Sequence, residues 1–419
     1  MMTREVEADG AAALVGLRVL DFGTGWAGPM AGQLLADMGA EVIKIESRTF
    51  MDGLRKGRPI ISDDVAGGDE GRWPDLQPVF HTLNRNKRSV TVNLKAPGAI
   101  ELVLRLVEIS DVVVNNFAPG VLERLGLGYE VLAARNPGIV VASMPAAGLS
   151  GPLKDVIGYA PTLSGLSGMA GLVGYEGGDV LGMTQIPYSD SVAAVTTVFA
   201  VLAALYEREQ SGRGQFIEVS QWEAMVCLMP ELVLTAAMTG GELGPQGSRH
   251  PLYFPHGSFR CADGKWLSLA VRDDDEWRRL YGLIGPLEGI DADSDVVVRR
   301  DRGEAVRAAI AAWAARLPAS EAARQLQSLG IPAFPVQDIG DLFVDPHLQE
   351  RNAFPYVEHP LVGAEPVPGV PWKLEKTPGS VRSAAPLLGA DNEYVFLQLL
   401  GLPRQEYEEL VRQGVIEVA

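Results

Sequence analysis

The sequence predicts an α/β fold in which helices cover both faces of a parallel sheet, accompanied by a smaller second domain. From Leu17 to Ser143, short apolar runs rich in β-branched residues alternate with segments of helical periodicity. The runs are apolar almost throughout, which is typical of parallel strands buried on both faces. With 419 residues, 47% of them hydrophobic and 21% charged, the chain is long enough for two domains.

The first strand is expected at Leu17–Phe22, followed by a helix at Met30–Met38 with Pro29 in its first turn, where proline is favoured. Residues 47–83 break the alternation with many Gly, Pro and Asp residues, and a loop of that length is usually functional or disordered. The other elements expected in this half are strands at Val42–Ile45, Ser89–Leu94, Asp111–Asn115 and Ile139–Ser143 and a helix at Ala99–Glu108.

The composition changes after a strand at Phe216–Ser220 and a single helix from Gln221 to about Met238. A glycine-rich linker at Thr239–Ser248 leads into a hairpin around residues 262–265, and residues 240–330 are expected to form a small α+β domain. Ile331–Val336 is expected to return to the large sheet. The helical patterns of this half are Asp275–Ile284, Arg302–Arg316, Ser320–Leu329, Asn392–Leu400 and Gln405–Gln413.

The formal net charge of −17 argues against nucleic acid and anionic membranes as partners, because both bind clustered Lys and Arg. No apolar run reaches the roughly 18 residues of a membrane span. Val192–Leu205 comes closest and is expected to be a buried helix. Cys227, Cys261 and the five histidines show no disulfide or metal-site spacing, so no metal is expected. Residues 1–13 lack the apolar segment of a signal peptide, which favours a cytoplasmic protein.

A glycine-rich turn follows the first strand. Gly23, Gly25 and Gly28 form a G-x-G-x-x-G pattern, and Glu46 closes the second strand, as in dinucleotide-binding proteins. A turn that opens a helix presents N–H groups to an anion, whether a pyrophosphate or a reacting thioester oxygen. Trp26 counts against NAD, because its side chain crowds the backbone where the pyrophosphate approaches. A tight structural turn is the remaining interpretation.

Asp190 directly precedes the apolar stretch Ser191–Leu205. One interpretation is a helix N-cap that satisfies unpaired N–H groups. The other is a nucleophile, because a carboxylate at a helix N-terminus is stabilised as the anion and Asp is a known covalent nucleophile.

The densest basic cluster consists of Asn84–Arg88 with Lys95. Asn116–Gly120, followed by Arg124, repeats the pattern after the next predicted strand. These residues are interpreted either as solvated loops or as a clamp on ligand phosphates.

Several segments together resemble the family III CoA-transferases, the group that contains formyl-CoA and carnitine CoA-transferases. The combination is specific and spans most of the chain. The segments that carry it are Gly16–Glu46, Asn84–Leu94, Asp111–Gly126, Leu202–Val219, Gly330–Arg351 and Pro386–Gly389.

The resemblance implies a large Rossmann-like parallel-sheet domain formed by both chain ends, residues 14–222 and 331–419, with the small α+β domain at 240–330 inserted. It also implies an interlocked homodimer, or an assembly with a paralogous subunit. The substrates it implies are an acyl-CoA and a small carboxylic acid, with no permanently bound cofactor.

In such a family the matching nucleophile is Asp190, which attacks an acyl-CoA thioester to give an aspartyl anhydride and then an aspartyl-CoA thioester. Gly25, Trp26 and Ala27 match positions that hold the thioester and the pantetheine arm. Arg48, Lys95 and Arg124 match basic residues near the CoA phosphates, Arg48 only to within one position.

The chain also departs from its relatives. Trp26 stands where formyl-CoA transferase has a glutamine, which argues against formate or oxalate as the small acid. The α-methylacyl-CoA racemases of the family carry an aspartate where this chain reads Gly158–Pro161 without one, so racemization is the weaker alternative. An NAD-dependent oxidoreductase and a non-catalytic CoA-binding subunit are the alternatives from other classes.

Overall fold

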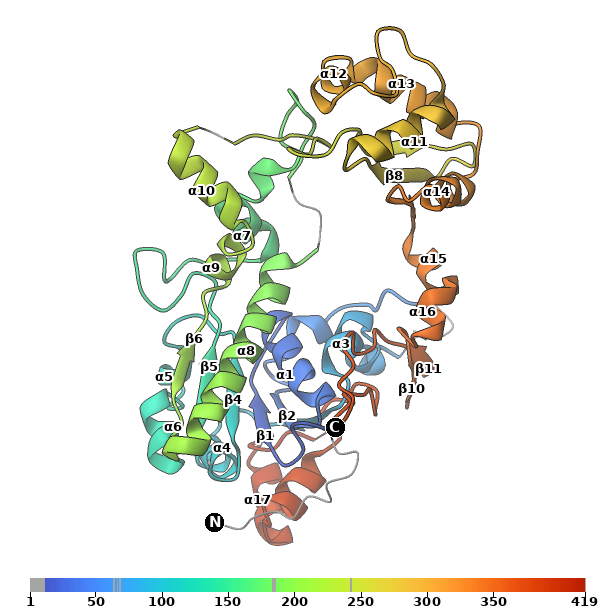
Figure 1. Cartoon of the computed structure of the whole chain (residues 1–419). Helices are drawn as coiled ribbons and strands as arrows, with labels where there is room; N and C mark the ends of the chain where they lie inside the picture. The colour runs from blue at the N-terminus through green and yellow to red at the C-terminus, as the bar shows by residue number, and fades with distance from the viewer. Residues whose placement is uncertain are drawn as a thin grey trace. The chain divides into compact units, whose positions relative to one another are not determined.

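The computed structural model describes residues 12–62, 65, 67, 69–182, 186–241 and 243–418. The chain divides into two compact units, both drawn in Figure 1. The large unit contains Met1–Met169, Met183–Gly241 and Asn352–Ala419, and the small unit contains Ala170–Gly182 and Glu242–Arg351. Residues 170–182 and 331–351 therefore lie in the small unit, outside the range 240–330 expected for it.

The large unit is built on a six-stranded sheet in the order β3-β2-β1-β4-β5-β6, with every neighbouring pair parallel. The order reverses between β1 and β4, and such a switch point is where α/β sheets bind ligands beyond the carboxyl ends of their strands. The strands are β1 (Arg18–Asp21), β2 (Glu41–Glu46), β3 (Lys87–Thr91), β4 (Val112–Asn115), β5 (Val140–Ser143) and β6 (Phe216–Glu218). The predicted parallel sheet is confirmed.

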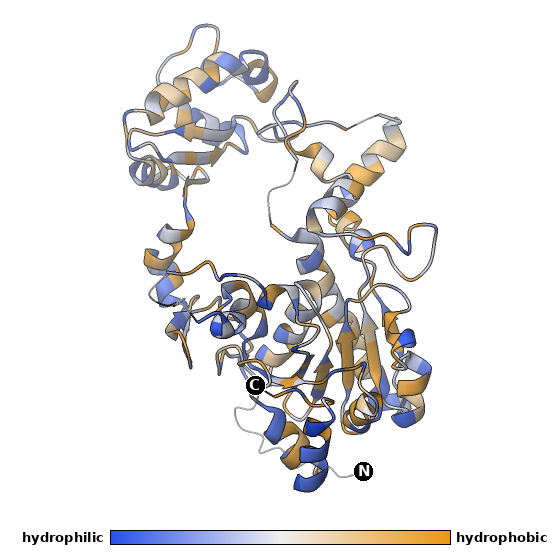
Figure 2. Ribbon diagram, turned by 180° about the vertical axis from the view of Figure 1, so that it is seen from behind, coloured by the Kyte–Doolittle hydropathy of each residue, from blue (hydrophilic) through white to orange (hydrophobic). Residues whose placement is uncertain are grey.

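Both faces of this sheet are apolar. In β1, Val19 faces one hydrophobic cluster and Leu20 the other, and Val112 and Val113 of β4 divide in the same way. Figure 2 shows these strands in hydrophobic colours. The alternation places one core under the helices α1 (Ala27–Asp37) and α8 (Tyr188–Ser211). A second core lies under α4 (Ala99–Glu108) and the C-terminal helix α17 (Arg404–Arg412).

Some of the other helices of the large unit lie beside the sheet and others extend away from it (Figure 1). Their bounds are α3 (Pro78–Asn84), α5 (Val121–Arg124), α6 (Tyr129–Arg135), α7 (Ala160–Leu166), α9 (Gln221–Val226) and α10 (Pro230–Thr239). The single helix expected from Gln221 to Met238 is wrong, because Pro230 lacks the N–H that would continue α9 and instead begins α10.

Helix α8 runs across the sheet from its carboxyl edge to its amino edge. Near its end, the Arg208 guanidinium donates to the Gly138 carbonyl and to Asp111 Oδ1, both at 3.1 Å. These two residues precede β5 and β4, so they mark the amino edge of the sheet. The first turn of α8 consequently lies toward the carboxyl edge, where the switch point is.

The buried helix expected at Val192–Leu205 is present within α8, but it is only partly buried. Val195 is 55% exposed, Phe199 75% and Tyr206 70%, although α8 packs on α1, α9 and two strands. Among the described residues, α8 is the one helix whose length and composition suffice to cross a membrane. A core helix of a soluble protein meets the same criterion, so this is weak support for a span.

The small unit contains an antiparallel three-stranded sheet, β7-β8-β9. Residues Ala333–Val336 form β9 and pair with β8, so the expectation that they return to the large sheet is wrong. The bounds in this unit are β7 (His256–Arg260), β8 (Trp266–Ala270), α11 (Asp274–Ile284), α12 (Val296–Asp301), α13 (Gly303–Ala314), α14 (Ala319–Ser328), α15 (Ile339–Val344) and α16 (Pro346–Glu350). A hairpin, β10 (Tyr356–His359) and β11 (Gly363–Pro366), belongs to the large unit.

Candidate active site

The glycine turn lies between β1 and α1, and its N–H groups are bonded to the protein's own side chains. Gly23 N donates to Asp21 Oδ1 at 2.7 Å, and Thr24 N donates to Asn116 Oδ1 at 2.9 Å. Gly25 N donates to both oxygens of Asp52 at 3.1 and 3.3 Å. These three amides are therefore not open to an anionic ligand, which corrects the simple view of the turn as an anion cradle.

Close packing or backbone conformation explains why glycine occupies these positions. Gly25 has φ +65°, in the left-handed region that glycine adopts without strain. A Cβ on Gly28 would lie 2.5 Å from Gly23 Cα and 2.8 Å from Asn116 Oδ1. The G-x-G-x-x-G spacing thus permits close contact between the turn, the start of α1 and the loop after β4.

Replacing Gly28 with alanine is expected to lower the free energy of unfolding by about 1–3 kcal/mol, because the new methyl group overlaps the turn. The turn would shift away from α1, so turnover should fall as well. Urea denaturation of the two proteins measures the first effect. The control is Gly165→Ala in α7, where nothing in the described structure lies within 4 Å of the added Cβ. An equal response of the two variants would contradict this account.

Glu46 is the acidic residue of the dinucleotide pattern, and its carboxylate is bound by other side chains of the protein. Its two oxygens each accept from Arg55 at 2.8 Å, and Oε2 also accepts from Ser89 Oγ at 2.6 Å. Burial alone would raise the pKa of Glu46, but Arg55, Lys44 and Ser89 hold it below its usual value. The carboxylate cannot receive a ribose hydroxyl in this arrangement. The turn amides that would bind the pyrophosphate of NAD and the carboxylate that would bind its ribose are therefore both bonded within the protein.

Asp190 lies in the first turn of α8, two residues inside the helix that Pro187 caps. Asp190 is thus near the N-cap but is not the cap residue itself. Its Oδ2 accepts from the Ser189 hydroxyl at 3.2 Å, and the N–H groups of Ala27 and of Asp190 itself face the carboxylate closely enough to lower its pKa. Ala27 is the first residue of α1, so the structure brings the glycine turn and Asp190 together.

Small side chains allow the two helix starts to approach. Ala27 and Ala31 of α1 pack with Ala193 and Ala194 of α8 in one buried cluster, which Met144 at the end of β5 completes. The site is therefore positioned by main-chain contacts between two helices and not by a long side chain.

Burial raises the pKa of Asp190 above its usual value, and the hydrogen bonds from Ser189, Ala27 and its own N–H oppose that shift. The carboxylate is half-buried, and fewer water molecules solvate it than solvate a surface aspartate. Only the ionised form of a carboxylate can attack an electrophile, so the fraction of Asp190 in that form falls as the pH drops through the raised pKa.

Two of the three predicted CoA-phosphate residues lie near one another. Lys95 is exposed, and its Nζ lies 4.0 Å from the centre of the Phe50 ring, two residues beyond Arg48. Arg48 is partly engaged, because its Nη2 donates to the Leu388 carbonyl at 2.9 Å. Lys95 is consequently the freer cation of the pair. Both follow the carboxyl ends of their strands, β3 and β2.

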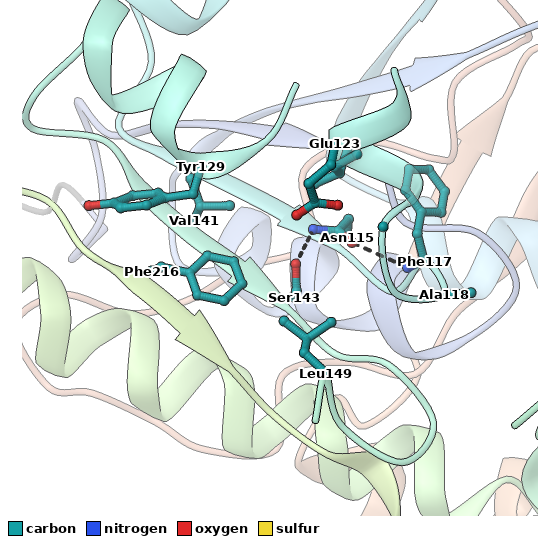
Figure 3. A pocket seen from close by; sticks show the side chains of 11 residues that line it. Asn115, Phe117, Ala118, Glu123, Tyr129, Val141, Ser143, Leu149 and Phe216 are labelled. Carbon is teal, nitrogen blue, oxygen red and sulfur yellow. Dashed lines mark hydrogen bonds between the residues drawn. The ribbon is translucent and has the colours of Figure 1, made fainter. Parts of the chain in front are cut away.

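The third residue, Arg124, is exposed on α5, after β4. It ends the helix that carries Leu122 and Glu123, which line a small crevice between the loops after β4 and β5 (Figure 3). In this crevice Asn115 Nδ2 donates to Ser143 Oγ at 2.7 Å. Its volume of about 10 Å³ holds roughly one water molecule, so no substrate group fits in it.

A larger cavity of about 530 Å³ lies between the loop after β5 and helix α9. Its lining is mainly apolar and consists of Ala147, Ser150, Gly151, Pro152, Leu153, Trp222, Glu223, Val226 and Cys227. A cavity of this size has room for a small organic group.

The basic cluster Asn84–Arg88 matches neither of its two interpretations. Arg85 pairs with Asp37 at 2.7 Å and Lys87 with Asp21 at 2.8 Å, and all four side chains are buried. Arg88 pairs with Asp391 at 3.0 Å. Arg85 and Lys87 are therefore neither solvated nor available to phosphates, whereas the Arg88 side chain is 40% exposed. Burial, together with the nearby Lys44, lowers the pKa of Lys87 to about 8 despite Asp21.

Within the described residues, no three His, Cys, Asp or Glu side chains gather in a way that could hold a metal ion. The geometry is instead that of a carboxylate on a backbone amide at the carboxyl edge of a parallel sheet. Residues 14–392 match the model of the CoA-transferase family III. This chain belongs to that family.

The family III chain is 33% identical over 408 residues to the succinyl-CoA–L-malate CoA-transferase beta subunit of Chloroflexus aurantiacus, covering 96% of this chain and 98% of that one. It is 34% identical over 390 residues to the succinyl-CoA:mesaconate CoA-transferase of Haloarcula marismortui, covering 90% and 93%. A CAIB/BAIF family protein from Brucella suis has a similar structure, with TM-score 0.82 and 27% identity over 93% and 100% of the chains. The predicted enzyme class and fold are confirmed.

This family III site also contains one residue that the sequence did not single out, Asp52, and one, Asn116, for which the sequence suggested a different role. Asp52 and Asn116 hold the turn but lie 27 and 92 residues from the amides they bind. Asn116 follows a predicted strand, and Asp52 belongs to the long segment flagged as functional or disordered. These two places in the sequence were the signals from which a contact with the turn could have been predicted.

Proposed function

We propose that this chain transfers CoA from an acyl-CoA to a carboxylic acid, with Asp190 as the nucleophile. The observation that carries the proposal is the Ala27 N–H on the Asp190 carboxylate, because it joins the glycine turn to a half-buried acid at the switch-point edge. The substrates named for the curated relatives support the same reaction class.

The proposed reaction has four balanced steps. The Asp190 carboxylate attacks the thioester carbonyl, forming an acyl-aspartyl anhydride and releasing CoA as the thiolate. The thiolate then attacks the aspartyl carbonyl, which releases the first acid as a carboxylate and leaves an aspartyl-CoA thioester. The second acid attacks this thioester to form a new anhydride and the thiolate. The thiolate finally attacks the new acyl carbonyl, giving the product acyl-CoA and free Asp190.

The turn residues Gly25, Trp26 and Ala27 are proposed to contact the thioester end, and Arg48, Lys95 and Arg124 the CoA phosphates. Support comes from their places after the carboxyl ends of β1, β2, β3 and β4. Trp26 is the one bulky side chain in the turn, so we propose that it limits the acids accepted. Lys95 is expected to contribute more than Arg48, whose guanidinium already donates to Leu388.

Purified chain incubated with succinyl-CoA and a panel of carboxylic acids tests this proposal, with mass spectrometry detecting each new acyl-CoA. Succinyl-CoA is the first donor because two relatives are named for it. We expect a CoA ester of at least one acid and a CoA adduct on the peptide that contains Asp190. A CoA adduct on another residue would contradict the mechanism. Binding of CoA without transfer would favour a non-catalytic subunit, and binding of NAD alone an oxidoreductase.

We also propose that the chain forms a homodimer through α8. Its exposed apolar side chains Val195, Phe199, Leu202 and Tyr206 recur at helical spacing on one face. An unpartnered apolar stripe of this kind is typical of an interface. The beta-subunit name of one relative makes a paralogous partner the alternative occupant.

Replacing Phe199 with glutamate is expected to raise the dimer dissociation constant by at least about tenfold, because a charge would be buried at the centre of the stripe. Light scattering after size-exclusion chromatography measures the change. The matched control is Ile60→Glu, since Ile60 is 93% exposed and lies outside the stripe. A wild-type chain that is monomeric at all concentrations would contradict the homodimer, and an equal shift in both variants would place the interface elsewhere.

A further inference from the structure

The segment after β2 returns to the glycine turn through one buried carboxylate. Asp52 is 7% exposed and precedes the short 3₁₀ helix η1 (Gly53–Arg55). Its Oδ1 accepts from Leu54 N at 2.9 Å and from Gly25 N at 3.1 Å, and its Oδ2 lies 3.3 Å from Gly25 N. The carboxylate thus caps its own helix and binds the turn at the same time.

The positively charged Lys44 side chain binds the same turn at a carbonyl group. Its Nζ donates to the Gly23 carbonyl at 2.7 Å and lies 3.8 Å from Asp52 Oδ2. Lys44 is 1% exposed, so the ion pair is shielded from water. One carbonyl and one amide of the turn are therefore fixed by a single buried pair of charges.

Gly25 needs this external support. Gly25 stands between the extended end of β1 and the right-handed helix α1, and its own φ of +65° is left-handed. A Cβ at this position would contact nothing within the described structure. Hydrogen bonds set the direction of the Thr24–Gly25 peptide group instead: its carbonyl accepts from Asn116 Nδ2 at 2.8 Å and its N–H donates to Asp52 at 3.1 Å. The Asp52 bond fixes the end of this group that lies only two residues before Ala27, whose N–H faces Asp190.

We propose that Asp52 is a positioning residue, which acts through Gly25 to direct the Ala27 N–H at the Asp190 carboxylate. The inference rests on the proposed function of Asp190. It also gives a role to the long Gly-, Pro- and Asp-rich segment: this segment supplies the acceptor that the short turn cannot supply itself. Without that acceptor, the Ala27 amide would turn away and Asp190 would lose a hydrogen bond that favours its ionised form.

The pH dependence of kcat/KM separates positioning from a purely structural role. For Asp52→Ala we expect a loss of about 10- to 100-fold in kcat/KM and an acid limb moved to higher pH, since misplaced groups cost this much in rate. Asp52→Asn retains an acceptor oxygen and should recover most of the loss. The control is Asp69→Ala in the same segment, because Asp69 caps a neighbouring 3₁₀ helix through Gly71 N at 3.0 Å.

Asp52→Glu provides the test if Asp52→Ala does not fold. It keeps the charge beside Lys44 but displaces the acceptor by one methylene, so its acid limb should move in the same direction by less. A folded Asp52 variant with the wild-type acid limb and turnover would overturn the inference, as would an equal change in Asp69→Ala.

Amide hydrogen exchange at Ala27 keeps the inference testable even if the wild-type chain transfers no CoA. We expect exchange at least threefold faster in Asp52→Glu than in the wild type, with Asp69→Ala unchanged. Unchanged exchange at Ala27 would overturn the role of Asp52, whereas absent CoA transfer with faster exchange would overturn only the proposed function.

Discussion

Asp190→Asn is expected to lower CoA transfer by on the order of 10⁴-fold or more while leaving the fold intact, because loss of a covalent nucleophile removes the reaction path. Asparagine has nearly the same volume and retains an oxygen that can accept the Ala27 N–H. The half-buried side chain has no salt bridge to lose within the described structure.

Steady-state transfer and thermal unfolding, measured on the same preparation, check this result. The matched control is Glu207→Gln, an exposed acid near the far end of α8 that should change neither quantity. The CoA adduct expected on the wild-type peptide should be absent from the variant. Near-normal turnover in Asp190→Asn would exclude the aspartyl mechanism, and a large loss in Glu207→Gln would show that any charge change on α8 is harmful.

Arg55→Met is expected to destabilise the protein by about 3–5 kcal/mol, because it leaves a buried carboxylate without its partner. Arg55 is 1% exposed, pairs with Glu46 through two bonds of 2.8 Å and with Asp75 at 2.7 Å, and lies 3.5 Å from the Phe80 ring centre. Removal of its charge should also raise the pKa of Glu46, which burial already favours.

Urea denaturation followed by circular dichroism measures this loss. Arg88→Met is the control, since its side chain is 40% exposed and its ion pairs should contribute about 1 kcal/mol or less. The double variant Arg55→Met with Glu46→Gln should be more stable than Arg55→Met alone, because the unpaired charge is gone. Equal losses in Arg55→Met and Arg88→Met would contradict the assigned cost of the buried charge.

The sheet was predictable because its signals are local. β1, β2, β4 and β5 fall within a residue or two of the predicted strands, and α4 has the predicted bounds, Ala99–Glu108. Each rests on continuous apolar runs or a strong apolar face, which tertiary contacts reinforce. The prediction that residues 333–336 join the large sheet was wrong, because nothing in an apolar strand sequence specifies which sheet it joins.

The candidate site was only partly predictable. The turn and Asp190 were found from their places at the starts of helices, and Ala27 was assigned through the resemblance. The role of Asp52 and Asn116 as acceptors for the turn amides was not predicted, because both residues come from distant loops. The cluster Asn84–Arg88 looked like a surface or a ligand clamp, since the carboxylates that bury it, such as Asp37 and Asp21, are separated from it by more than 45 residues.

The donor on Asp190 is a main-chain amide at the start of α1. The bond uses no atom of the Trp26 side chain, although the small Ala27 side chain is needed for α1 to approach α8. Under the proposed function, substitutions at Trp26 would therefore alter the shape presented to an incoming acid while the Ala27 amide stays on the proposed nucleophile. This separation would give the scaffold a route to new acid preferences through changes in a few turn side chains, with the proposed reaction unchanged.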